Sequence, residues 1–183
     1  MTLESQSDQS YDRVARLLHW LLAALLIAQL AFGWWLDEVP RNTPARGYFI
    51  NLHKSVGVVL GLLVLARLGW RLGHKPPAWP STLPAWQRQA SSITHRLLYG
   101  LMLIVPISGY LASNFSKHGI NFFNSIKLAP WDVDNRDIYA LFNQTHKLSV
   151  ALLAGLIAIH AGAALWHGLR RDGVLSRMGL RPF

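Results

Sequence analysis

Four stretches of this sequence contain no Asp, Glu, Lys or Arg, and they constrain the fold more than any other feature. They run over residues 17–36, 55–66, 97–116 and 148–169. A helix needs about 20 mostly apolar residues to cross the hydrocarbon core of a bilayer. Three of the stretches reach that length, and 55–66 does so if Lys54 lies at one interface and Arg67 is accepted inside the membrane.

We therefore predict an all-α fold, a transmembrane bundle of four helices that forms a single membrane domain over residues 1–183. An even number of spans places both termini on the same side. The first span is too long for the hydrophobic region of a signal peptide and follows an acidic, polar segment, so we expect it to be retained. A short interfacial helix is expected around residues 135–141. The predicted spans lie near residues 14–36, 51–72, 92–113 and 142–169.

The charged residues are distributed unequally between the two ends of this bundle. Lys plus Arg is 18 and Asp plus Glu is 9, and the side with the termini and the 73–91 loop has a net charge of +7 against +2 on the other. Loops rich in Lys and Arg stay in the cytoplasm, so we predict cytoplasmic termini. The cations are too dispersed for a nucleic-acid module, and we expect no nucleic acid as a partner.

The chain has no cysteine but 8 histidines. The lack of cysteine excludes disulfides, thiolate-bound iron–sulfur clusters and covalent c-type haem. A histidine inside a membrane span is costly unless it has a partner or a function. One such residue is readily explained by a hydrogen bond between helices, but four at matched depths are not. These four are His19, His53, His146 and His160.

Spacing sorts the four histidines into two pairs. His146 and His160 are 14 residues apart, which brings them within about 40° of one helix face and separates them by about 21 Å along the axis. His53 lies near the outer end of its span, as His146 does, and His19 lies in the inner half, as His160 does. We predict that each pair ligates the iron of a non-covalent b-type haem in the bundle core.

Other interpretations compete with these assignments. His95, at the inner end of the third span, is an alternative inner ligand; we prefer His19 because polar residues around His95 indicate an interface. A zinc or di-metal site would gather three or four ligands at one depth, usually with carboxylates, and no acid lies in a span. A membrane protein without haem, such as a transporter, is the alternative for the whole chain. His74 and His118 are expected in loops without a role.

Further residues are candidates for cofactor or substrate contacts. Arg67 lies 14 residues after His53, at the inner level, where it would pair with a haem propionate or else extend to the cytoplasm. Gly57, one turn from His53, would admit a flat macrocycle or serve ordinary helix packing. His167 and His95 are the candidates for a quinone or proton-transfer site, although a solvated interfacial residue is the simpler interpretation of His167.

With these residues in place, the sequence resembles the bacterial cytochrome b-561 family over about residues 11–178. The resemblance rests on Arg16 to Trp20, Asn51 to Gly57, Arg67 to Arg71, His95 to Tyr99, Pro106 to Gly109, His146 with Lys147, and His160 with His167. It implies a multi-pass bacterial inner-membrane cytochrome with two b haems. The four family ligand positions fall on His19, His53, His146 and His160.

The resemblance also implies electron transport. Some members are implicated in superoxide oxidation coupled to quinone reduction, which makes ubiquinone a candidate substrate and superoxide:quinone oxidoreductase a candidate activity. Related cytochromes are membrane subunits of hydrogenases and other dehydrogenases, so a haem-bearing anchor subunit with a dehydrogenase partner is the alternative.

The expected mechanism is electron transfer between a periplasmic donor and the quinone pool. Iron held by two histidines has no open position and exchanges electrons at the haem edge. Apolar side chains should fill the space between the two levels, and cations at the outer mouth would attract an anion such as superoxide, unless they only solvate the surface. The filling residues are Val150, Leu153 and Ile157, and the cations are Lys54, Lys117, Lys127, Arg136 and Lys147.

Overall fold

Four long helices dominate the computed structural model, which describes residues 10–80, 83–131 and 134–180. Four charged residues that the charge count included lie outside these ranges: Glu4, Asp8, Asp132 and Arg181. Each long helix is sufficiently long and apolar to cross a membrane, so the predicted four-helix transmembrane fold is confirmed. The helices are α2 (Arg13–Glu38), α3 (Pro44–Gly73), α4 (Ala85–Asn114) and α5 (Arg136–Arg170), followed by the short 3-10 helix η1 (Leu175–Met178).

Polar residues cap the starts of α2, α3 and α5, whereas α4 follows Pro84 without a side-chain cap. The Asp12 carboxylate accepts a hydrogen bond from Ala15 N at the start of α2, and this bond lowers the pKa of Asp12. Thr43 caps α3 through Arg46 N and is followed by a proline in the first turn. Asn135 caps α5 by accepting from two backbone N–H groups. Caps satisfy the orphan donors of the first turn, so these three helices start directly after polar residues.

The helices therefore extend beyond the predicted spans. α3 begins at Pro44, not near residue 51, and α4 begins at Ala85, not near residue 92. The separate interfacial helix predicted around residues 135–141 is wrong, because these residues form the cap and first turns of α5. Hydropathy detects only the part of a helix that matches the hydrocarbon core, whereas the caps lie in the polar flanks.

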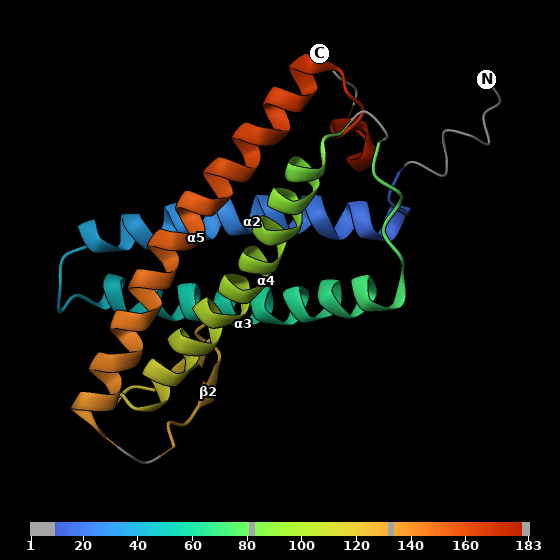
Figure 1. The fold of residues 1–183 in the computed structure, drawn as a ribbon. Helices are drawn as coiled ribbons and strands as arrows, with labels where there is room; N and C mark the ends of the chain where they lie inside the picture. The colour runs from blue at the N-terminus through green and yellow to red at the C-terminus, as the bar shows by residue number, and fades with distance from the viewer. Residues whose placement is uncertain (1–9, 81–82, 132–133, 181–183) are drawn as a thin grey trace.

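The four helices form two antiparallel pairs that cross each other. α2 packs beside α3 and α4 beside α5, and α3 also contacts α4 (Figure 1). A small cluster of Leu22, Leu60 and Val64 joins α2 to α3. Gly61 of α3 faces Pro106 of α4, with 3.4 Å between an ideal Cβ and the proline ring. Exposed large apolar side chains far outnumber the buried ones, as expected where lipid is the solvent.

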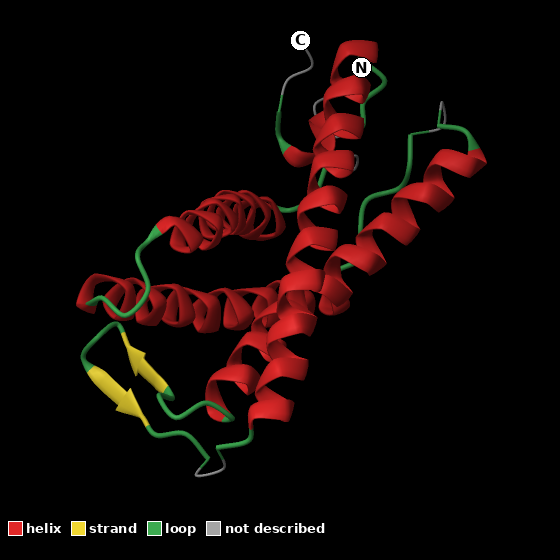
Figure 2. Cartoon of the chain, turned by 90° about the vertical axis from the view of Figure 1, so that its left-hand side faces the viewer, coloured by secondary structure: helices red, strands yellow, loops and turns green. Residues whose placement is uncertain are grey.

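A hairpin covers one end of α3. β1 (Ile120–Phe122) pairs antiparallel with β2 (Ile126–Leu128) (Figure 2). Ser55 Oγ accepts from Phe123 N at 2.8 Å, Asn51 Oδ1 accepts from the middle residue of β1, and Lys54 Nζ donates to Gly119 O at 2.9 Å. The hairpin, which the sequence did not predict, thus lies over the helix segment that contains His53.

The two described ends of the chain meet at the other end of the molecule. Tyr11 N donates to Arg177 O at 3.0 Å, and Trp20 Nε1 donates to Met178 O at 3.1 Å. The buried Arg177 donates from Nη2 to Pro77 O at 2.5 Å and lies over the Trp79 ring. The described ends of the chain and the α3–α4 loop therefore gather at one end, away from the hairpin (Figures 1 and 2).

Candidate functional site

Two pairs of histidine rings lie between the crossing helices. In each pair, one ring comes from α5 and the other from α2 or α3. The inner pair, His19 of α2 and His160 of α5, has ring centroids 6.2 Å apart and planes at 78°. The outer pair, His53 of α3 and His146 of α5, has centroids 6.4 Å apart and planes at 88°. The structure therefore brings together the residues that the depth argument paired.

The spacing of both pairs fits one metal ion held in line between the rings. A bond from a first-row metal to imidazole nitrogen is about 2.0–2.1 Å long, and that nitrogen lies about 1.1 Å from the ring centroid, so in-line ligation separates centroids by about 6.3 Å. A direct hydrogen bond between the rings would bring the centroids to about 5 Å. The observed 6.2 and 6.4 Å match ligation, so these residues fit iron in a haem.

The outer pair is oriented and enclosed by neighbouring helices. His146 Nδ1 donates to Val105 O at 2.8 Å. Since a carbonyl can only accept, the ring proton lies on Nδ1 and Nε2 keeps its lone pair for a metal. An ideal Cβ on Gly109 would lie 3.0 Å from His146 Nδ1, and one on Gly33 would lie 3.0 Å from His53 Cε1. Any larger residue at either glycine would displace the imidazole ring beside it.

Gly57, a predicted haem contact, lies beside a polar side chain instead of a ring. An ideal Cβ there would lie 3.8 Å from Gln29 Nε2, which donates to His53 O at 2.7 Å. The Gln29 amide thus finds an acceptor within the membrane span, and its side chain ties α2 to the helix that holds His53. The role of Gly57 toward a macrocycle stays a prediction.

The inner pair borders a partly open cavity between the helices. Ligand and cofactor sites are mostly apolar with a few polar groups. The cavity has that character, because its polar groups are three imidazoles, a guanidinium and a phenol among aliphatic side chains. It is lined by His19, His95, His160, Arg67, Tyr99, Leu22, Ala23, Leu26, Ile27, Leu98, Met102 and Ile157.

Arg67 contributes a partly buried cation to this cavity. Its Nε donates to Tyr99 OH at 3.1 Å, while its buried Nη1 has no hydrogen-bond partner among the residues that the structure describes. A buried donor without an acceptor costs about 1–3 kcal/mol, and more when charged. The carboxylate of a haem propionate would satisfy this nitrogen, so Arg67 also fits the cofactor.

His95 lies in the same cavity but at a different distance from His160. Its ring centroid is 5.4 Å from that of His160, shorter than in-line ligation needs. Its Nδ1 donates to Ser91 O at 2.7 Å, which leaves Nε2 with a lone pair. Spacing therefore favours His19 as the inner ligand, and His95 lies beside the site.

Apolar side chains separate the two levels along α5. Leu153 is only 1% exposed, and Ile157 lines the inner cavity. Among the described residues, no three His, Cys, Asp or Glu side chains gather as a metal cluster would require. Of the other histidines, His118 is exposed, and the exposed His74 stacks on Trp70 with ring centroids 3.9 Å apart.

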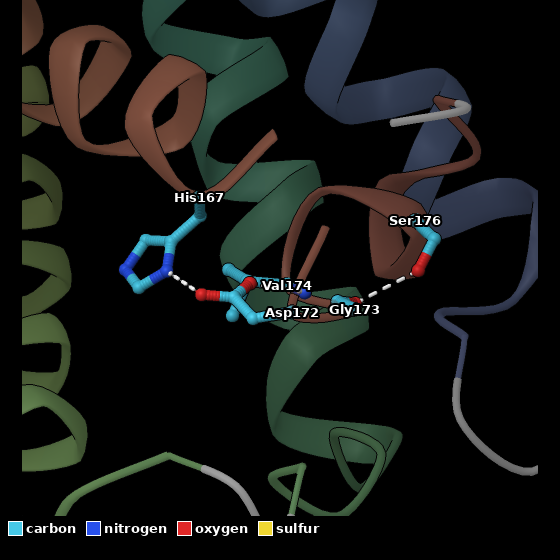
Figure 3. A network of polar contacts seen from close by, with 5 residues as sticks. All are labelled: His167, Asp172, Gly173, Val174 and Ser176. Carbon is cyan, nitrogen blue, oxygen red and sulfur yellow. Dashed lines mark hydrogen bonds and ion pairs between the residues drawn. The ribbon is translucent and has the colours of Figure 1, made fainter. Parts of the chain in front are cut away.

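At the inner end of α5, His167 is paired with an acid that sequence reasoning did not single out. His167 Nδ1 donates to Asp172 Oδ2 at 2.5 Å, and both side chains are largely buried (Figure 3). The available signal was local: an Asp–Gly step follows two arginines directly after the apolar run. Such a step predicts a turn, but not that the turn would fold back onto the helix.

The predicted outer cations have different surroundings. Lys54 is half-buried and donates to the hairpin, whereas Lys117 lies 3.4 Å from Asp134 and both side chains are well exposed. Lys127, Arg136 and Lys147 are also exposed. The hairpin and the start of α5 therefore carry exposed cations, interspersed with the exposed acids Asp134 and Asp137.

Comparison with known proteins identifies the relatives of this chain. Residues 10–180 match the family described as prokaryotic cytochrome b561. Cytochrome b561 homolog 1 of Escherichia coli (strain K12) is 29% identical over 165 residues, which cover 88% of this chain and 92% of that protein. Cytochrome b562 of Cereibacter sphaeroides is 28% identical over 180 residues, covering 96% and 98% of the two chains.

Proposed function

This chain belongs to the prokaryotic cytochrome b561 family, and we propose that it holds two haems b and passes electrons from a periplasmic donor to membrane quinone. Its family makes it a multi-pass protein of the bacterial inner membrane that transfers electrons with haem b. The proposal adds the number of haems, their ligands, the donor and the acceptor. We place one haem between His53 and His146 and the other between His19 and His160.

The observation that most supports two haems is the equal spacing of the two ring pairs. Both pairs have centroids close to the roughly 6.3 Å that in-line ligation requires. When bound, a haem with two histidine ligands supplies one-electron transfer at its edge, because its iron has no open position. The two pairs lie about 21 Å apart along α5, from the rise per residue of a helix.

The protein side chains orient and shield the cofactors. Val105 O fixes the His146 ring with Nε2 free for the metal. Arg67 offers its unpaired Nη1 to a carboxylate in the inner cavity. The buried Leu153 excludes water between the levels, and a dry interior keeps the electrostatic effect of Arg67 strong.

Charge distribution supports an orientation with the chain ends in the cytoplasm. The end formed by Tyr11, the α3–α4 loop and η1 carries the larger cation excess, as cytoplasmic loops do. The outer pair and the hairpin then face the periplasm. Cations there would steer a small anion toward the outer haem, which favours superoxide as the donor. Quinone would accept electrons at the inner end, near His167 and His95.

The proposal is tested on the purified protein in nanodiscs. A reduced-minus-oxidised spectrum should show the α-band of b-type haem, and superoxide should reduce the haems, which ubiquinone should then reoxidise. A chain without a b-type α-band would overturn the haem assignment. Haems that superoxide does not reduce would overturn the donor, and haems that ubiquinone does not reoxidise would overturn the acceptor.

A further inference from the structure

We infer that Asp172 is a positioning residue that holds the His167 imidazole so that its Nε2 gives a proton to a quinone carbonyl oxygen. The inference rests on the proposed quinone reduction and extends it to the proton step. The two side chains form an ordered pair at the inner end of α5, with Nδ1 of His167 2.5 Å from Oδ2 of Asp172. Their side chains are only 13% and 19% exposed, so the pair is shielded from bulk water.

The backbone after α5 is shaped to hold this carboxylate in place. Arg171 adopts the left-handed conformation with φ 53°, which ends the helix and turns the chain back. Asp172 Oδ1 then accepts from Val174 N at 3.2 Å, and Gly173, at φ 86°, accepts from Ser176 Oγ at 2.8 Å (Figure 3). One carboxylate oxygen is bound by the backbone and the other by His167, so the acid has a fixed orientation.

The pair lies where a quinone reduced at the inner haem would take up protons. His167 follows His160 by 7 residues, which places it about 10.5 Å further along α5 and within about 20° of the same face. The residues between them are apolar or glycine. The second ring nitrogen of His167 points away from Asp172 (Figure 3). His167 is therefore the next titratable group on the face that holds the inner ligand.

The chemistry of quinone reduction needs such a group. A quinone that becomes a quinol takes up two electrons and two protons, and two superoxide anions can supply the electrons as they become two molecules of dioxygen. One proton leaves His167 Nε2 for one quinone oxygen, while the Nδ1 proton stays on the ring, hydrogen-bonded to Asp172. The second proton reaches the other quinone oxygen from cytoplasmic water, which also returns a proton to Nε2. The carboxylate accepts the hydrogen bond of Nδ1, so Nε2 is the ring nitrogen left to the substrate.

The same bond has a purely structural alternative, in which it only anchors the C-terminal turn to α5. Two observations weigh against that role as the sole one. The turn already has its own Ser176–Gly173 hydrogen bond, and η1 is held separately by Tyr11 and Trp20. An anchor at this position also has no need of a titratable ring in an otherwise apolar helix segment.

The test uses the full-length protein in nanodiscs, with its haems reduced by a stoichiometric amount of dithionite. Decylubiquinone is added and haem reoxidation is followed by stopped-flow absorbance. For Asp172→Asn we expect the maximal rate to fall about 10–100-fold, since general acid catalysis contributes about 10²–10⁴-fold, with the half-saturating quinone concentration unchanged. Asp172→Glu should restore most of the rate. Haem content and reduction by superoxide should equal the wild type in both.

The matched control is Ser176→Ala, which removes a hydrogen bond from the same turn and leaves the pair intact. We expect its rate to stay within about twofold of the wild type. An unchanged rate in Asp172→Asn, or an equal loss in Ser176→Ala, would overturn the positioning role. A wild-type protein whose haems are not reoxidised by quinone would instead overturn the proposed function, and the inference with it.

A second measurement is made on the wild-type protein, and a variant serves only to assign its signals. The ¹⁵N spectrum of the wild-type protein, with the His167 signals assigned by their loss in His167→Gln, should show a proton on Nδ1 in a strong hydrogen bond. A neutral ring protonated only on Nε2 would contradict the inference, because that tautomer has no Nδ1 proton to donate to the Asp172 carboxylate.

Discussion

Replacing Gly109 with alanine tests how closely the protein fits around the outer ligand His146. An ideal Cβ at Gly109 would lie 3.0 Å from His146 Nδ1 and 3.1 Å from Cε1, whereas ordinary contacts begin at 3.4 Å. The ring must therefore retreat by about 0.4 Å, and its 2.8 Å hydrogen bond to Val105 O must stretch or bend. We expect Gly109→Ala to weaken the binding of the outer haem and to leave the binding of the inner haem unchanged.

The magnitude follows from how little a metal–ligand bond can move. Ligand distances are usually held to within about 0.2 Å, half of the required displacement. Disturbing the groups that orient a metal-bound histidine typically costs 10–100-fold in affinity. We therefore expect the outer haem to dissociate about 10–100-fold faster, which corresponds to about 1.4–2.7 kcal/mol.

The assay is haem transfer to an excess of apomyoglobin, followed by absorbance. The wild type should release its haems slowly, and Gly109→Ala should show one fast phase of one haem per chain. Gly155→Ala is the matched control, because it is also a helical glycine but an added Cβ would meet no atom within 4 Å. Both substitutions gain the same helix propensity. Equal release from both variants would refute the close fit at His146.

Four further predictions concern the ligands, the buried cations and the second glycine. His146→Ala should lose the outer haem and keep the inner one, and His160→Ala should do the reverse; pyridine haemochrome spectra and potentiometric titration would show it, and loss of both haems in each variant would contradict the pairing. Gly33→Ala should weaken the outer haem as Gly109→Ala does, because its Cβ would lie 3.0 Å from His53 Cε1; release as slow as in Gly155→Ala would contradict this. Arg67→Gln should lower the midpoint potential of the inner haem by several tens of millivolts, since one unit charge in a partly buried site is worth about 1–2 kcal/mol. Redox titration would measure this shift, and a shift in the potential of the outer haem alone would contradict the assignment of Arg67 to the inner haem. Arg177→Ala should lower the unfolding free energy by about 2 kcal/mol, because it removes a charged hydrogen bond to Pro77 O and the contact with Trp79; thermal unfolding in detergent would test it, and an unchanged Tm would count against that anchor.

The fold class could be predicted from sequence because uncharged runs of membrane length have few structural solutions. The helix ends could not, because α3 and α5 are capped by Thr43 and Asn135, which lie outside those runs. The hairpin over 120–128 was also missed. Its position depends on long-range bonds to Ser55 and Asn51, and no local pattern contains such contacts.

Part of the candidate site could also be predicted from the sequence. Histidine positions along a helix follow from a constant rise and turn, so depth could pair His53 with His146 from sequence alone. The contacts of Gly33 and Gly109 with those rings depend on how the helix pairs cross. Asp172 was missed because the left-handed turn at Arg171 brings it back to His167, and a residue's backbone conformation at a helix end is only weakly encoded locally.

The most direct test of this account is the number of haems per chain. Quantitative amino-acid analysis gives the protein concentration, and the pyridine haemochrome spectrum gives the haem b in the same sample. The two in-line ring pairs predict two haems b per chain in the wild type, and one in either His146→Ala or His160→Ala. A wild-type value of one would contradict the two-site assignment, and a value of zero would contradict the account as a whole.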